Sequence, residues 1–250
     1  MAAFEFVELV ARAYASLAHF PLADPETCLG GRFLYAGELD DTGRALLIAA
    51  NVAGAATLAA TADRAAQKQA LRDGVADFLV NSFDESLRIL KNQLRKRETA
   101  SVCVALAPEP IEREMRERGV VPDLLRTDLS FKEENACATA LSKSAAVVAW
   151  WVAAAPAQWL PRLDTIALGC LEANAGASRR WLRLSPRYLG RLAQGLRLLH
   201  CDREFAARFT EQVRQRIERG EILVAVEIRS NCAGEHDEHR FVPGRPISGN

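Results

Sequence analysis

The residues best suited to chemistry lie in one turn at positions 36–44. Gly37 and Gly43 stand where small residues would let backbone N–H groups approach a phosphate. The turn also carries three acids, Glu38, Asp40 and Asp41. These carboxylates can hold a cation that bridges to a ligand, or they can form an ordinary solvated turn, and they would repel a bare diphosphate. The turn therefore predicts a ligand site and leaves the charge of the ligand open.

The segments around this turn indicate how it is positioned. Apolar residues at 33–36 predict a short buried strand, and the apolar stretch at 45–54 predicts a helix. A second strand follows and ends at Asp63. Strand, glycine-containing turn, helix and strand form the first half of a nucleotide-binding βαβ unit.

Further strands are expected at 76–80, 101–106 and 120–125, with helices between them. The strand at 101–106 is continuously apolar, as central parallel strands tend to be. Alternating strands and helices predict an α/β fold with a doubly wound, mostly parallel, Rossmann-like sheet. Ligands bind such sheets beyond the carboxyl ends of the strands. The segments expected to line the site are 36–44, 61–64, 106–109 and 126–131.

The rest of the chain has a different texture. Residues 1–31 are expected to form a helix and a loop before the Rossmann-like domain at 32–131. Residues 132–229 are expected to be a mainly helical region with further strands, and the tail at 230–250 to be irregular. Within that region we expect a helix through 133–155, a possible strand at 164–169, a helix at 203–219 and a strand at 221–228. The apolar run at 145–155, with Trp150 and Trp151, is interpreted as a core helix or the face of a homodimer.

Other reactive side chains have plainer explanations. Cys232, His236 and His239 are spaced like zinc ligands, but they fall in the expected irregular tail, so no metal site is assigned. Arginines gather between 179 and 197 and can bind phosphate or nucleic acid. A solvated helix face paired with acids is the preferred explanation.

Composition excludes several classes of partner. The chain has 32 acidic and 32 basic residues, so we expect neither a nucleic-acid nor a membrane partner. The six cysteines are scattered, and no signal peptide is evident, so a cytoplasmic protein with reduced thiols is expected. The longest apolar run is too short for a transmembrane helix, which needs roughly 20 residues.

Three short motifs carry a family likeness. Ala36-Gly37 and Gly43 are followed by Ala53-Gly54-Ala55. The run from Arg118 to Asp123, Arg-Gly-Val-Val-Pro-Asp, is followed by Thr127-Asp128-Leu129-Ser130. With these motifs, residues 32–130 resemble the NAD-binding, Rossmann-like domain of the urocanase (urocanate hydratase) family.

The resemblance implies a cofactor and contacts to it. In that family oxidised NAD acts as an electrophile that holds the substrate while water adds. The cofactor-binding residues that the resemblance implies are Gly37, Gly43, Asp63, Thr127, Asp128 and Ser130. Asp63 would contact the ribose hydroxyl. The family's central glycines are replaced here by the segment Glu38–Thr42.

Two functions are therefore expected. The first is a stand-alone urocanase-like protein that binds a small ligand or nucleotide, or assembles with itself, and lacks urocanate hydration. The second is an NAD-dependent lyase (hydratase) related to urocanase, completed by a partner subunit. In the first case NAD is a possible ligand and no catalytic residue is assigned.

Overall fold

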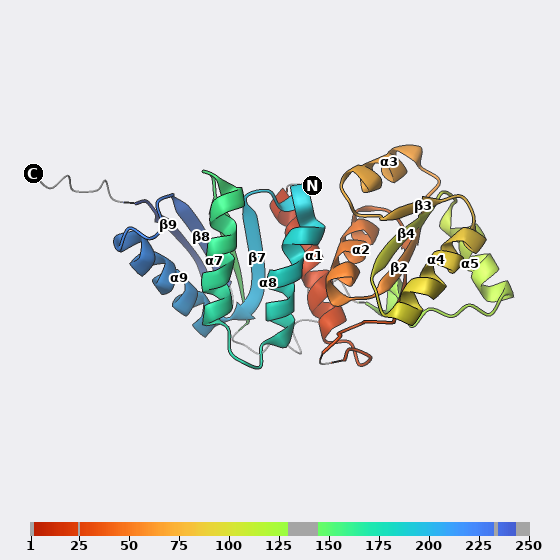
Figure 1. Ribbon diagram of the computed structural model, residues 1–250, viewed down its shortest axis with the longest axis horizontal. Coiled ribbons are helices and arrows are strands. Elements are labelled where there is room, and N and C mark those ends of the chain that lie inside the picture. Colours follow the sequence, from red (N-terminus) through yellow and green to blue (C-terminus); the bar gives the residue numbers. More distant parts are fainter. Residues whose placement is uncertain (1–2, 25, 130–144, 233–234, 244–250) are drawn as a thin grey trace, which may run out of the picture. The chain divides into compact units, whose positions relative to one another are not determined.

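A computed structural model describes residues 3–24, 26–129, 145–232 and 235–243 (Figure 1). The chain forms two compact units. The first comprises the described residues up to 129 together with Arg183–Leu192, and the second comprises those from 145 to 182 and from 193 onward.

The first unit contains a five-stranded parallel sheet in the order β3-β4-β2-β1-β5. The strands are β1 (Phe33–Glu38), β2 (Ala56–Ala60), β3 (Phe78–Val80), β4 (Ala100–Val104) and β5 (Leu124–Leu125). β2 and β4 lie near the centre and are buried at every position, which explains their mostly apolar sequence.

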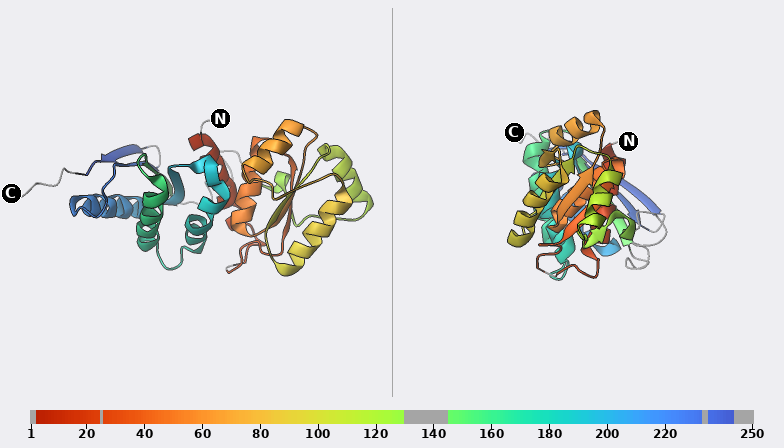
Figure 2. Two further views of the ribbon diagram at one scale, coloured as in Figure 1. Left: turned by 45° about the horizontal axis from the view of Figure 1, so that its top comes forward. Right: turned by 90° about the vertical axis from the view of Figure 1, so that its right-hand side faces the viewer.

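Helices cover both faces of this sheet (Figures 1 and 2). The helices of the first unit are α1 (Ala3–Ala18), α2 (Asp41–Ala53), α3 (Arg64–Arg72), α4 (Phe83–Lys96) and α5 (Pro108–Glu117). Phe83 and Leu90 of α4 and Ile111 of α5 pack with strand residues in one core cluster. On the opposite face Asn51 of α2 donates to Ser101 of β4 at 2.7 Å. The predicted doubly wound, mostly parallel α/β fold is confirmed.

The second unit is built on an antiparallel sheet in the order β7-β6-β8-β9. Its strands are β6 (Ala145–Val152), β7 (Leu196–Asp202), β8 (Val226–Cys232) and β9 (Glu235–Phe241). α7 (Pro156–Cys170) and α9 (Arg203–Glu218) pack on one face, where Trp150 contacts Phe209 with ring centroids 4.8 Å apart. α8 (Gly176–Leu189) continues from this unit into the first.

Several local predictions for this part of the chain are wrong. Residues 145–152 form a strand, because their valines and tryptophans favour strands and hydrogen bonds to β7 and β8 on both sides outweigh the helix preference of the alanines. The central position of β6 also explains the apolar run without a dimer face, and Trp150 is fully buried. The possible strand at 164–169 lies within α7. The expected irregular tail instead contains the end of β8 and all of β9.

Among the described residues, no helix is both long enough and apolar enough to cross a membrane.

The predicted helix at 203–219 matches α9, and the strand predicted at 221–228 begins later, at Val226.

Candidate functional site

The turn from β1 into α2 is closed by two glycines with different roles. Gly37 has a φ of 69° at an irregularity in the pairing of β1 with β2, a backbone conformation that side chains disfavour. A Cβ on Gly43 would lie 2.1 Å from the carbonyl oxygen of Glu38. Gly43 therefore lets the first turn of α2 approach the end of β1, a packing role that glycines also have in dinucleotide-binding turns.

Asp40 occupies the amino-terminal end of α2. Its Oδ1 accepts a hydrogen bond from the Gly43 backbone N–H at 2.7 Å, so Asp40 is the N-cap of the helix. Arg126, just after β5, donates to Oδ1 at 3.0 Å and to Oδ2 at 2.9 Å. Partial burial acts to raise the pKa of Asp40, but the hydrogen bonds from Arg126 and Gly43 outweigh it and lower the pKa.

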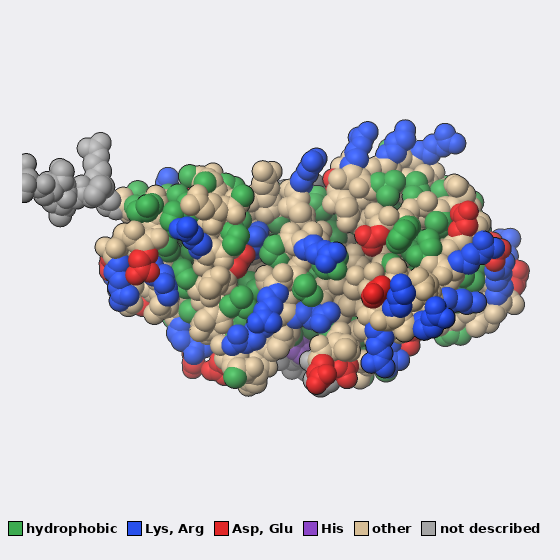
Figure 3. All heavy atoms as spheres, in the orientation of Figure 1, with side chains coloured by type: hydrophobic (Ala, Val, Ile, Leu, Met, Phe, Trp, Pro, Cys, Tyr) green, Lys and Arg blue, Asp and Glu red, His purple; other side chains and the backbone are tan. Residues whose placement is uncertain are grey.

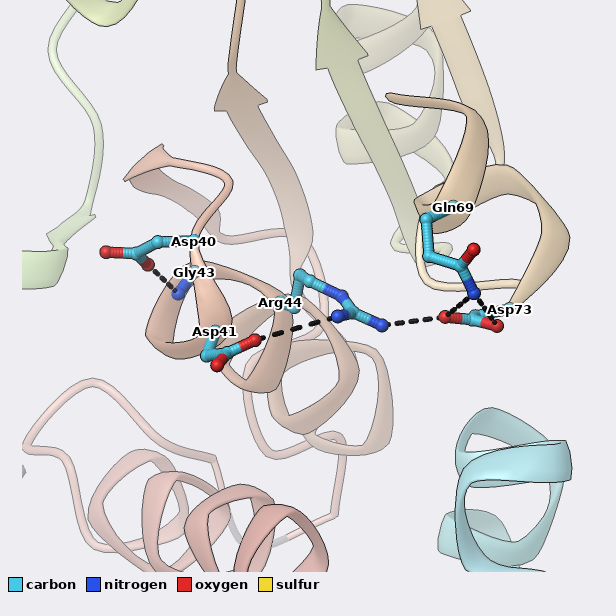
Figure 4. Close-up of polar contacts among 6 residues, drawn as sticks. All are labelled: Asp40, Asp41, Gly43, Arg44, Gln69 and Asp73. Atoms are coloured by element: carbon cyan, nitrogen blue, oxygen red, sulfur yellow. Dashed lines mark hydrogen bonds and ion pairs between the residues drawn. The ribbon is translucent and has the colours of Figure 1, made fainter. Parts of the chain in front are cut away.

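The neighbouring acid, Asp41, belongs to a second ion-pair network (Figure 4). Arg44 lies 3.6 Å from Asp41 and 2.7 Å from Asp73 at the end of α3. Gln69 donates to both oxygens of Asp73 at 2.9 Å. Two of the three acids in the turn are thus paired with arginines, and the described residues contain no cluster that could hold a metal ion.

Asp63 also acts as a helix cap. Its Oδ1 accepts from the Ala65 N–H at 2.7 Å and so begins α3. Its position directly after β2 agrees with the predicted site at the carboxyl ends of the strands. The cap assigns it a structural role, and the predicted ribose contact stays a prediction.

The segment after β5 holds the remaining predicted cofactor contacts. Oδ2 of Asp128 accepts from the Leu125 N–H at 2.8 Å and stabilises the 3-10 turn η1 (Arg126–Asp128). Thr127, in the same turn, is exposed and lines a cavity. Ser130 lies outside the described residues.

The cavity that Thr127 lines has a volume of about 700 Å³. It lies beside β1, β5 and α5, and we call it the β1–β5 cavity. Its floor includes buried Tyr35, whose hydroxyl donates to Glu112 at 3.3 Å. Burial, together with the nearby charge of Glu112, raises the pKa of Tyr35. The other lining residues are Gly37, Glu38, Met115, Arg116, Gly119, Val120, Val121, Pro122, Leu125 and Arg126.

The predicted site residues are only partly brought together. Gly37 and Thr127 line the β1–β5 cavity, whereas Gly43 and Asp63 are not among its lining residues. Tyr35 and Glu112 were not predicted as site residues, whereas Arg126 lies in the expected lining segment 126–131 but was assigned no contact of its own. The position of Arg126 directly after a strand, at the edge of the sheet where the acidic turn lies, could have indicated that it pairs with an acid of that turn.

The candidate zinc ligands fall on the β8–β9 hairpin. His236 pairs with Asn231 and His239 pairs with Ile228. Residues three apart on a strand point to opposite faces, so these two histidines do not converge. Cys232 is the last residue of β8.

The first unit is therefore a Rossmann-like domain, defined by its parallel sheet and its helices on both faces, and it carries a cavity beside β1, β5 and α5. Residues 13–134 match the family model of the urocanase Rossmann-like domain. This chain thus carries a Rossmann-like domain of the urocanase family, as its sequence motifs predicted.

Proposed function

We propose that this urocanase-related protein binds a small ligand in the β1–β5 cavity, does not hold NAD at the start of α2 and does not hydrate urocanate. The observation that carries this proposal is the position of the Asp40 carboxylate. It accepts from the Gly43 N–H at 2.7 Å and pairs with Arg126. Because the Asp40 carboxylate already lies at the amino-terminal end of α2, the Gly43 N–H that a pyrophosphate would use is engaged.

Charge adds to this effect. A dinucleotide phosphate at the turn would have to displace Asp40 and would then lie beside two carboxylates, Asp40 and Asp41. Like charges about 4 Å apart repel by roughly 1 kcal/mol in water and by more near a protein surface. NAD binding in the manner of the family is therefore disfavoured.

The β1–β5 cavity supports a small ligand instead. Apolar side chains of Met115, Val120 and Leu125 form part of its wall, and the Tyr35 hydroxyl and the Glu112 carboxylate supply polar groups. A mostly apolar cavity with a few polar groups is the usual form of a small-molecule site. The equal numbers of acidic and basic residues also favour a small molecule over nucleic acid as the partner.

The alternative is an NAD-dependent lyase, completed by a second copy or another subunit. Gly37 and Gly43 in the turn, Asp63 after β2 and the family match at residues 13–134 favour it. Self-association as a homodimer belongs to the same set of proposals, and analytical ultracentrifugation would test it.

The first experiment measures what the purified protein carries and what stabilises it. The protein is denatured and the released molecules are analysed by mass spectrometry, and melting is followed with and without NAD. We expect no stoichiometric NAD and no NAD-dependent rise in melting temperature. Asp40→Gly removes the carboxylate but keeps a residue that caps helices nearly as well, so this variant should gain NAD-dependent stabilisation.

Two matched controls sharpen the result. Asp41→Asn removes one charge from the same turn without freeing the Gly43 N–H, and it should gain no response to NAD. A released small molecule that disappears in Glu112→Gln and stays in Glu109→Gln belongs to the β1–β5 cavity, because Glu109 does not line it. Stoichiometric NAD in the unmodified protein would overturn the proposal and would justify an assay of urocanate hydration.

A further inference from the structure

The second unit contains a separate groove between α7 and α9. Both helices pack on the same face of the antiparallel sheet, and the groove between them has a volume of about 810 Å³. Trp159, Ile166 and Ile222 contribute apolar surface to it, and Arg162, Arg208 and Arg216 contribute charge. We call this the α7–α9 groove. Figure 3 shows basic and acidic side chains beside one another over α9.

The acidic side chains in the groove are already paired. Glu211 accepts from Arg214 at 2.6 Å and from Gln215 at 2.6 Å. The hydrogen bond from Arg214 is the main reason that the pKa of Glu211 falls to about 2. Glu221 pairs with Arg216 at 3.0 Å. Neither carboxylate is left to neutralise a further arginine at close range.

The arginines, in contrast, keep donors in reserve. The Arg162 guanidinium lies 4.7 Å from the centre of the Trp159 ring and forms no ion pair with another described residue. Arg208 reaches Glu172 only at 3.8 Å. Nε of Arg216 is buried and has no hydrogen-bond partner among the described residues. The groove therefore has more donors than acceptors.

The carboxyl-terminal end of α7 does not neutralise the positive charge that the arginines bring to the groove. The carbonyl groups at a helix carboxyl end carry partial negative charge and repel anions. Here the Arg179 guanidinium donates to the carbonyl of Leu171 at 2.6 Å and to that of Leu168 at 3.3 Å. Burial raises the pKa of Cys170, and the charges of Arg208 and Arg216 oppose that rise, so both arginines act on the same part of the groove.

We propose that the α7–α9 groove binds a small organic anion, a carboxylate or phosphate group carried on an apolar body. Arg162 and Arg208 pair with the anionic group and Arg216 adds positive charge to the same groove, while Trp159 and Ile222 contact the apolar part. Guanidinium groups suit this task because they present several donors to carboxylate and phosphate oxygens. The site is distinct from the β1–β5 cavity and does not depend on the proposed function of that cavity.

Cys170 lies in the groove and provides a local probe. The rates at which iodoacetate and iodoacetamide alkylate each cysteine of the full chain are measured by peptide mass spectrometry. The reagents differ in charge, so a positive groove should raise the iodoacetate to iodoacetamide ratio at Cys170 about fivefold over that at Cys28. Benzoate should slow the alkylation of Cys170 by iodoacetamide, and the neutral analogue benzamide should not.

Variants connect the effect to the arginines. In the double variant Arg162→Gln with Arg208→Gln, the iodoacetate to iodoacetamide rate ratio at Cys170 should fall to the ratio measured at Cys28. Benzoate should then no longer slow the alkylation of Cys170. Arg203→Gln removes a charge from the same helix, α9, at a position that does not line the groove, and it should change neither. Equal ratios at both cysteines and no protection by benzoate would overturn the proposal.

If Cys170 reacts with neither reagent, a second measurement, of thermal stability, tests the same site. Benzoate and inorganic phosphate should raise the melting temperature of the unmodified chain more than that of the double variant at equal ionic strength. Benzoate acting alone would point to a carboxylate ligand, and phosphate acting more strongly would point to a phosphorylated one. An equal response of the unmodified chain and the double variant to both anions would refute the site.

Discussion

Arg126 holds Asp40 through two hydrogen bonds, from Nη1 to Oδ1 at 3.0 Å and from Nη2 to Oδ2 at 2.9 Å. The two residues are 86 positions apart in sequence and join the turn after β1 to the turn after β5. Arg126 also donates to the carbonyl oxygen of Glu38 at 3.3 Å. The pair therefore fixes the edge of the sheet at which a ligand of a Rossmann-like domain is expected.

The Asp40 carboxylate should make stability depend on pH in a defined range. Its pKa is lowered in the folded protein from the ordinary 3.8, so its stabilising effect is present above pH 4 and is lost as the pH falls through the lowered value. Asp40→Asn keeps a capping oxygen and loses the charge. The difference in melting temperature between the two proteins should be constant from pH 5 to 7 and should shrink below pH 4, as the pH falls through the lowered pKa of Asp40.

A comparison of Asp40→Ala with Asp40→Asn separates the contribution of the helix cap from that of the charge. The first of these variants is the more damaging one. It loses both, and it should cost about 1–2 kcal/mol in the free energy of unfolding at pH 7. Asp40→Asn should cost clearly less. Equal costs in urea denaturation would contradict the role of Asp40 as an N-cap.

Gly43→Ala should be among the most destabilising substitutions in the first unit. The new methyl group would lie 2.1 Å from the Glu38 carbonyl oxygen, and backbone cannot move aside as a flexible side chain can. We expect a loss of about 3 kcal/mol. Gly169→Ala is the matched control, because a Cβ there meets nothing within 4 Å. That change lies inside a helix and should be neutral or stabilising by up to about 1 kcal/mol.

A buried polar contact joins α2 to β4. Asn51 donates to Ser101 at 2.7 Å, and both side chains are buried. Ser101→Ala leaves the Asn51 amide without this partner and should cost about 1–3 kcal/mol. Combining Ser101→Ala with Asn51→Leu should cost less than the sum of the two single changes, as measured by a double-mutant cycle. An additive result would show that the contact contributes nothing.

The second unit contains a buried ion pair between Asp164 and Arg197 at 3.0 Å, and the two side chains are only 11% and 12% exposed. Burial raises the pKa of Asp164, while the charge of Arg197 opposes the rise. A carboxyl group with a raised pKa in the folded state lowers stability as the pH rises above its unfolded value.

Arg197→Met should therefore cost about 3 kcal/mol at pH 7 and less at pH 4, where Asp164 can stay protonated. The double variant Asp164→Leu with Arg197→Met should recover much of that loss at pH 7. Guanidinium denaturation at the two pH values measures both effects. A cost that does not change with pH would contradict the raised pKa.

The parallel sheet could be predicted because its central strands, β2 and β4, are buried at every position. The strand expected at 101–106 corresponds to β4, and the strand at 33–36 to most of β1. Their mostly apolar residues and the glycines at the ends of helices are local signals, so a single sequence contains them. The family motifs pointed to the same domain independently.

The C-terminal sheet and the ion pairs of the site could not be predicted in the same way. β6 combines alanine with valine and tryptophan, so its local preference is mixed, and its pairing with β7 and β8, each more than 40 residues away, decides that it is a strand. The contact between Asp40 and Arg126 likewise depends on β1 and β5 being neighbours. Local propensity contains no information on such distant partners.

The carboxylate at the start of α2 has a consequence for any anion that approaches this domain. Asp40 is tethered to the helix that it caps, so it competes as an intramolecular ligand whose effective concentration is at least in the millimolar range reached with short flexible linkers. A free phosphate compound must exceed that concentration or bind more strongly to replace it. One side chain thus sets a threshold for anion entry, and a single substitution at position 40 would remove it.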